Sequence, residues 1–290
     1  MKKTLITGAT GGLGNEIVKT LAEEVDQSNL FALVRDVQKA AELKALGINI
    51  VEGNYEDANS LEKAFQGIEN LFFISASDIP DRTAQHMNVL EAAKRAGVSH
   101  IFYTGFAMIT NGSQSAIDFI AEAHKQTEAW LKQSGITYTI LKNGLYMDML
   151  PMFAGENVVD SGKLFFPAGE GKVSFALKSD LAKASVKILT SEDHENKEYT
   201  LTGKAVSWAE IAQQISQASG TEVQYISPSR ESYEEVLTEA GVPSEYVQMF
   251  SSFAESMKQS ELDVSDETLN KLLDHSSVDT NEFIHQAYQR

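Results

Sequence analysis

Cysteine is absent from the sequence, which excludes disulfide bonds, thiolate catalysis and cysteine-ligated metal sites. The other residues predict no metal site either. Basic residues are also few: 24 Lys and Arg stand against 41 Asp and Glu, for a formal charge of -17. Because affinity for nucleic acid depends on Lys and Arg that neutralise phosphates, this balance argues against nucleic acid and anionic membranes as partners.

Long hydrophobic runs are lacking as well. No stretch of about 18 uninterrupted apolar residues occurs, and no apolar segment with a small-residue cleavage site begins the sequence. We therefore expect a cytoplasmic protein with no membrane partner, either a monomer or a homodimer. The chain has 290 residues, of which 42% are hydrophobic, and this is enough for a sizeable core.

Short apolar runs alternate with segments of helical spacing over the first half of the chain. Parallel strands joined by crossover helices are the expected product, so the predicted class is α/β, a Rossmann-type doubly wound parallel sheet. Ligands bind such sheets at the carboxyl ends of the strands. The predicted strands are 4–7, 30–34, 48–51, 71–74, 100–104 and 137–141, and the predicted helices are 13–24, 37–46, 60–65, 83–96 and 116–133.

This alternation ends after Pro151, where glycines punctuate a loop-rich stretch before helices at 179–189 and 208–219. We predict a dinucleotide-binding Rossmann domain over 1–150 and a smaller, mainly helical substrate-binding lobe over 151–290. One strand, around 199–201, is expected to return to the Rossmann sheet.

A glycine-rich loop directly follows the first predicted strand and opens the first predicted helix. In this setting Gly8 permits a tight turn, Gly11 lets the backbone approach a pyrophosphate, and Gly14 lets helix and strand pack closely. The pyrophosphate then rests on the N–H groups of the helix N-terminus. A glycine-rich turn without a ligand is the structural alternative. The loop residues assigned to a dinucleotide cofactor are Gly8, Thr10, Gly11, Gly12, Leu13 and Gly14.

The end of the second predicted strand decides between the two nicotinamide cofactors. Sites for NAD place a carboxylate there for the ribose 2′-OH, whereas this strand is followed by Arg35. A guanidinium suits the 2′-phosphate of NADPH, and Lys39 adds a second positive charge. Asp36 would instead bind the ribose of NADH if the strand register were shifted by one residue. The plainer interpretation is that Arg35 is a solvated surface residue. We expect NADPH, with NADH as the weaker alternative.

In these and other segments the sequence resembles the atypical short-chain dehydrogenases of the NmrA-like family, especially NAD(P)H:quinone oxidoreductases and triphenylmethane reductases. The resemblance covers nearly the whole chain and implies two lobes with the cofactor between them. It also implies hydride transfer from NADPH to a quinone or another flat electrophile. The matching segments are 7–14 (TGATGGLG), 33–36 (LVRD), 73–77 (FISAS), 124–128 (HKQTE), 138–146 (YTILKNGLY), 168–172 (AGEGK) and 200–203 (TLTG).

The resemblance assigns further residues to the site. Small residues at a strand end let a ribose or pyrophosphate lie against the backbone, although they are equally common in plain turns. Aromatic and methionine side chains after the sixth strand and in the tail suit a planar guest, although such clusters most often form core. The resemblance places Ser75, Ala76 and Ser77 beside the cofactor and Asn143, Gly144 and Tyr146 near the nicotinamide. The apolar character of the cluster itself suggests Tyr146, Phe153 and Phe250 as substrate contacts.

The Tyr–Lys proton relay of typical short-chain dehydrogenases is missing. Tyr138 and Lys142 have the required spacing of four, but they fall in a β-branched, strand-like run that would hold them about 13 Å apart. In related enzymes a Glu commonly lies four residues after the relay Lys. If Glu128 is that Glu, Ile120 stands at the Tyr position and His124 at the Lys position. His124 remains a weak catalytic candidate, although a histidine on a half-buried helix is more often structural.

The sequence thus predicts an NADPH-dependent reductase that transfers a hydride to a quinone-like or other planar electrophilic small molecule, chiefly by positioning. A regulator that senses NADP without turnover is the main alternative, and the missing relay favours it. A nucleotide-sugar epimerase is a third option, but it needs the acid/base pair that the sequence lacks.

Overall fold

The computed structural model describes residues 2–77, 80–110 and 114–289. Its largest sheet contains β1 (Thr4–Ile6), β2 (Leu30–Val34), β3 (Asn49–Glu52), β4 (Asn70–Phe73), β5 (His100–Phe106), β6 (Thr137–Asn143) and β10 (Lys197–Leu201). All are parallel, in the order β10-β6-β5-β4-β1-β2-β3. Every residue of β1 and β4 is buried, as expected for strands covered on both faces. The predicted doubly wound α/β class is confirmed, and the six strands predicted from the first half all occur.

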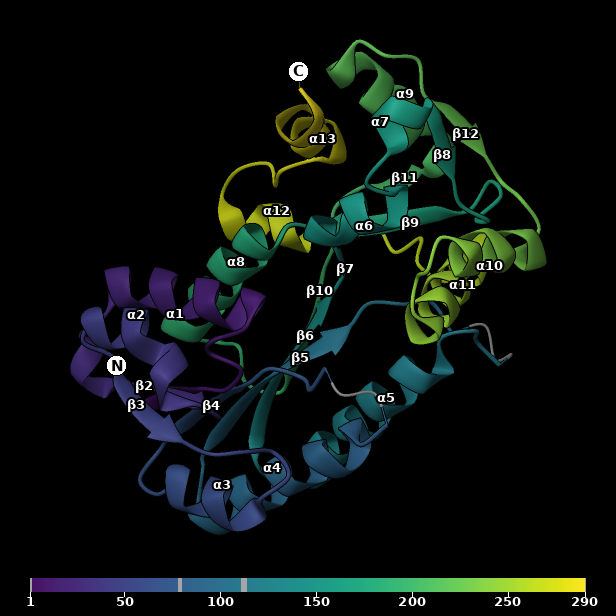
Figure 1. The fold of residues 1–290 in the computed structure, drawn as a ribbon. Coiled ribbons are helices and arrows are strands. Elements are labelled where there is room, and N and C mark those ends of the chain that lie inside the picture. Colours follow the sequence, from purple (N-terminus) through teal and green to yellow (C-terminus); the bar gives the residue numbers. More distant parts are fainter. Residues whose placement is uncertain (1, 78–79, 111–113, 290) are drawn as a thin grey trace.

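Helices cover both faces of this sheet (Figure 1). One layer holds α1 (Gly12–Glu24), α2 (Ala41–Ala45), α8 (Lys178–Thr190) and α12 (Thr268–Leu273), and the other holds α3 (Ala58–Ala64), α4 (Arg82–Ala96) and α5 (Asp118–Gln133). Instead of one helix over 37–46, the chain forms a 3-10 turn, η2 (Val37–Ala40), followed by α2. Two other 3-10 turns are η1 (Gln27–Asn29) and η3 (Met147–Met149).

The chain returns to the Rossmann layers after it has left them. Helix α8 packs along α1, β10 extends the sheet beside β6, and α12 packs on α8. In the β10–β6 pair, Lys197 lies opposite Thr139 and Leu201 opposite Asn143. From these contacts we propose that the Rossmann unit comprises the chain up to the end of β6 (2–143) together with 178–201 and 268–273.

The remaining elements form a second lobe around Trp208, which is fully buried. Its strands make a sheet in the order β11-β9-β7 and a pair, β12-β8. A capping box between Ser207 and Glu210 begins its central helix where the sequence predicts it. None of the helices in the described ranges is both long and apolar enough to cross a membrane. The elements are β7 (Leu145–Tyr146), α6 (Leu150–Ala154), α7 (Val158–Ser161), β8 (Lys163–Phe165), β9 (Lys172–Ala176), β11 (Ala205–Ser207), α9 (Trp208–Ser219), β12 (Gln224–Ile226), α10 (Arg230–Glu239), α11 (Ser244–Lys258) and α13 (Thr280–Tyr288).

Candidate functional site

The glycine loop joins β1 to α1 at the carboxyl edge of the sheet. Gly8 has a φ of +59°, and its carbonyl accepts a hydrogen bond of 2.9 Å from Gly11 N, which closes the turn. A Cβ on Gly14 would lie 2.2 Å from Gly8 O, so only glycine lets α1 approach this closely. No side chain in the described part of the chain caps the N-terminus of α1. Gly12 is exposed, so the free N–H groups of this helix end are open to an anion.

The other loop residues divide by exposure. Thr10 and Gly11 are exposed beside the helix N-terminus, whereas the Leu13 side chain is buried in the core between α1 and the sheet. Any contact from Leu13 to a ligand would therefore come from its backbone.

The predicted cofactor-selecting residues follow β2. Arg35, Asp36 and Lys39 are all exposed. Asp36 Oδ1 accepts a hydrogen bond of 2.9 Å from Gln38 N and so caps the turn η2. One oxygen of the Asp36 carboxylate is therefore engaged within the turn itself, whereas Arg35 and Lys39 extend into solvent.

Three side chains fix the backbone where β4 ends. Thr7 Oγ1 accepts from Ile74 N, Thr104 Oγ1 accepts from Ser75 N, and His86 Nε2 accepts from Ala76 N, each at 2.9 Å. Ser77 lies beyond them and is exposed. Sequence reasoning placed 75–77 at this strand end but missed its supports. The two threonines follow from the sheet order, because they lie at the carboxyl ends of the strands on either side of β4.

His86 is held in its neutral form. It is 1% exposed, and its Nδ1 lies 2.8 Å from Thr127 Oγ1. Thr127 donates its own proton to Ala123 O, so Nδ1 must carry the proton and Nε2 is free to accept from Ala76 N. Burial lowers the pKa of His86 to about 3, aided by the electrostatic influence of the neighbouring His124 and Arg82.

His124, the weak catalytic candidate, lies in the same buried network on α5. Its Nδ1 is 2.7 Å from the Tyr103 hydroxyl, and it is 7% exposed. Burial and the nearby Arg82 lower the pKa of His124 to about 3. The imidazole is therefore neutral at neutral pH and has no acidic proton of the kind that an imidazolium donates.

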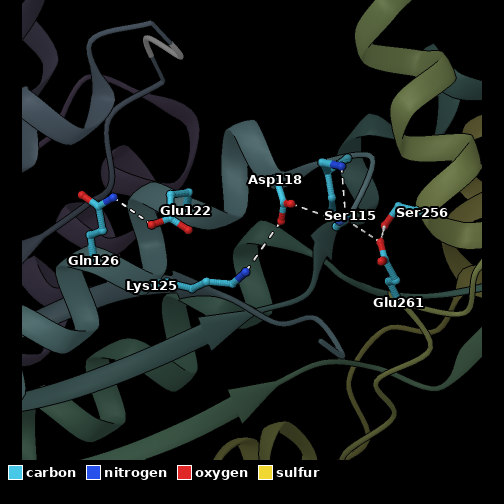
Figure 2. Close-up of polar contacts among 8 residues, drawn as sticks. Ser115, Asp118, Glu122, Lys125, Gln126, Ser256 and Glu261 are labelled. Carbon is cyan, nitrogen blue, oxygen red and sulfur yellow. Dashed lines mark hydrogen bonds and ion pairs between the residues drawn. The ribbon is translucent and has the colours of Figure 1, made fainter. Parts of the chain in front are cut away.

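The lysines near the expected relay position are held in ion pairs. Lys125 Nζ lies 3.7 Å from Asp118 Oδ1 along α5 (Figure 2). Lys142 Nζ lies 2.8 Å from Glu198 Oε2 and 3.3 Å from Glu128 Oε2. Burial alone would lower the pKa of Lys142, but the two carboxylates outweigh it and the pKa is raised. Tyr138 is on β6 with Lys142, as predicted, so the two do not share a helix face.

Asn143 ends β6 with an unusual side chain. It is 2% exposed, and neither its Oδ1 nor its Nδ2 has a hydrogen-bond partner among the described residues. The amide approaches the Tyr146 hydroxyl closely enough to offset part of the burial that raises the pKa of Tyr146, but not with hydrogen-bond geometry. An unpaired buried polar group costs about 1–3 kcal/mol, so this amide is well suited to a polar ligand. A Cβ on the next residue, Gly144, would lie 2.7 Å from Ser174 O.

The three residues predicted to contact the substrate lie in two different parts of the structure. Phe153 and Phe250 are 3% and 7% exposed in the core of the second lobe, with ring centroids 5.4 Å apart. Tyr146 is half-buried and packs instead against the Rossmann core. One cavity of about 740 Å³ lies in the second lobe, and another of about 350 Å³ lies between that lobe and Asn270 of α12; none of the predicted site residues lines them.

A buried carboxylate joins the loop after β5 to the second lobe. Glu261, just beyond α11, is 1% exposed, and its Oε2 accepts hydrogen bonds of 2.6 Å from Ser115 and Ser256 (Figure 2). Its backbone oxygen also accepts from Ile109 N at 2.7 Å. Ser115 and Glu261 are 146 positions apart in the sequence, and no sequence motif predicted their contact.

Comparison with known proteins finds several oxidoreductases that are similar to this chain over most of its length. Quinone oxidoreductase 2 of Escherichia coli is 33% identical over 284 residues, 98% of each chain. Its solved complex with NADPH has a TM-score of 0.92 and covers 99% of this chain and 100% of that one. The Citrobacter triphenylmethane reductase complexed with NADP(H) is 35% identical with a TM-score of 0.90, covering 98% and 99% of the two chains. An NAD(P)H azoreductase of Xenophilus azovorans is 33% identical over 82% of each chain. The profile of the NmrA-like family matches residues 1–284, and this chain belongs to that family.

Proposed function

We propose that this chain is an NADPH-dependent reductase that transfers a hydride to a quinone-like or other planar, electron-poor small molecule. The enzyme class, an NAD(P)H oxidoreductase, and the cofactor follow from relatives of about one-third identity over nearly the full chain. The observation that carries the proposal is the open N-terminus of α1 behind a closed glycine turn, at the carboxyl edge of a parallel sheet.

The chain's own residues fit the cofactor from end to end. The loop residues Gly8, Thr10, Gly11, Gly12, Leu13 and Gly14 would hold the pyrophosphate, because their backbone surrounds the uncapped helix end. Arg35 and Lys39 would bind the 2′-phosphate. Ser75, Ala76 and Ser77 would lie beside the ribose, and the unpaired amide of Asn143 would meet the polar carboxamide end.

When bound, NADPH supplies a hydride, and the protein's contribution is positioning and exclusion of water. Phe106 lies directly beside Asn143 in the β5–β6 pairing and is half-buried. We assign the substrate face to Phe106 and Tyr146, which present flat rings at the strand ends. Phe153 and Phe250 then contribute indirectly, as core residues whose packing holds this part of the second lobe in place.

Solvent supplies the proton in this proposal. His124 is neutral and hydrogen-bonded to Tyr103, and Lys125 and Lys142 are paired with carboxylates. A quinone or similar acceptor becomes a stable anion after it gains a hydride, so it does not require a proton in the same step. Acceptors of this class therefore suit a site without a proton relay.

Anaerobic oxidation of NADPH, followed by the loss of its absorbance with a panel of quinones and cationic dyes, tests the proposal. We expect turnover with at least one acceptor and none without acceptor. Tight NADPH binding with no turnover on any acceptor would overturn the reductase and favour the NADP-sensing regulator. Conversion of nucleotide sugars without net NADPH oxidation would identify an epimerase.

A further inference from the structure

Lys178 places a positive charge directly above the glycine loop. It is the first residue of α8 and follows β9, whose pairing with β7 sets Tyr146 opposite Ala176. The Lys178 side chain crosses to the N-terminus of α1, where a Cβ on Gly12 would lie 3.3 Å from Lys178 Cδ and 3.4 Å from its Nζ. Sequence reasoning missed this residue because α8 comes more than 160 positions after the loop.

The ammonium of Lys178 has only weak partners in this position. Its Nζ lies 5.3 Å from the centroid of the Tyr146 ring and 4.0 Å from Asp148 Oδ1, at the limit of an ion pair. The closer contact of Asp148 is to the Lys178 backbone, whose N–H donates to Asp148 Oδ2 at 3.1 Å. The side chain is 25% exposed, so it is neither buried in a tight pair nor freely solvated.

Two helix dipoles make the placement unfavourable in the absence of an anion. Lys178 stands at the N-terminal end of its own helix, α8, and above the N-terminus of α1, and both ends carry partial positive charge. The first turn of α1 contains no acidic residue that would offset this charge. At α8, Asp180 in the first turn and Asp148, which accepts from Lys178 N, offset part of this charge, so the uncompensated end is that of α1. An anion at the start of α1 would therefore interact favourably with that helix end and with the ammonium.

We propose that Lys178 binds the pyrophosphate of the cofactor, as a second cationic contact separate from Arg35. The inference rests on the proposed dinucleotide function and assigns a residue to the diphosphate that NADPH and NADH share. Arg35, at the end of β2, would read the 2′-phosphate that only NADPH carries. The two residues should therefore differ in which ligands they affect.

Fluorescence titration of the purified full chain with NADPH, NADH and ADP-ribose separates these roles. In Lys178→Met we expect all three ligands to bind about 10-fold to 100-fold more weakly, by a similar factor, because a charge-assisted hydrogen bond to phosphate is lost. The affinity should also fall less steeply with added salt than in wild type. Lys178→Arg should keep the affinity within about threefold, since it retains the charge.

The matched control is Lys183→Met, which removes an exposed lysine from the same helix and should leave all three affinities unchanged. Circular dichroism checks that each variant is folded. Unchanged affinities in a folded Lys178→Met protein, or a loss confined to NADPH, would overturn the assignment of Lys178 to the pyrophosphate. A wild-type chain that binds none of the three ligands would instead overturn the proposed function.

Discussion

Mild acid should destabilise this protein because several of its histidines are buried as neutral imidazoles. His86, His100 and His124 have pKa values lowered from 6.5 to about 3, 4 and 3, in each case mainly by burial. Below the unfolded pKa each takes up a proton on unfolding, so the stability that each contributes is complete above pH 6.5 and is lost as the pH falls. Between about pH 7 and about pH 5.5 the loss is about 1.3 kcal/mol per histidine, or about 4 kcal/mol for the three together.

Urea denaturation at the two pH values measures this loss as a change in the free energy of unfolding. The window stays above the range in which most carboxylates titrate, so histidines dominate it. His124→Gln should reduce the pH dependence by about one third, whereas His285→Gln, which changes an exposed histidine, should leave it intact. A wild-type free energy that changes by less than about 1 kcal/mol across the window would refute the neutral buried network.

Three further substitutions probe the cofactor site, the missing relay and the carboxylate that joins the lobes. Arg35→Asp should weaken the binding of NADPH, measured by titration, by about 10-fold to 100-fold and the binding of NADH far less. The same charge change at an exposed lysine, Lys63→Asp, should affect neither affinity. Equal losses of NADPH and NADH affinity in Arg35→Asp would contradict NADPH selection. Tyr138→Phe should keep most activity, so a folded variant slowed by about 100-fold or more would restore a tyrosine acid. Glu261→Ala should lower the free energy of unfolding by about 1–3 kcal/mol, because two buried serines lose their acceptor. An unchanged melting temperature would show that the contact contributes little.

The layers of the fold and the glycine loop could be predicted because contiguous residues encode them. Buried parallel strands are continuous apolar runs, and Gly8, Gly11 and Gly14 follow one of these runs directly. The rejection of Tyr138 and Lys142 as a relay was equally local, because their β-branched surroundings indicate a strand. The predicted loop geometry also agrees with the φ of +59° at Gly8 and the close approach at Gly14.

The supporting contacts could not be predicted, because they join residues that are distant in the sequence. Lys178 meets Gly12, and Ser115 meets Glu261, only after the chain has folded back on itself. Burial of Phe153 and Phe250 was equally hidden, because aromatic residues after a strand fit a core and a ligand surface equally well. Asn143 was found through family resemblance alone, since its missing partners are visible only in three dimensions.

The return of α8 and β10 to the Rossmann layers means that no single continuous gene fragment encodes the half that we propose to bind the cofactor. A truncation near residue 150 would leave the edge of β6 unpaired and the apolar face of α1 uncovered, and such edges promote aggregation. The segment from β7 to β9 instead enters and leaves the Rossmann unit at β6 and α8. It is therefore arranged as an insertion, so during evolution its loops could be exchanged while the seven-stranded sheet remained intact.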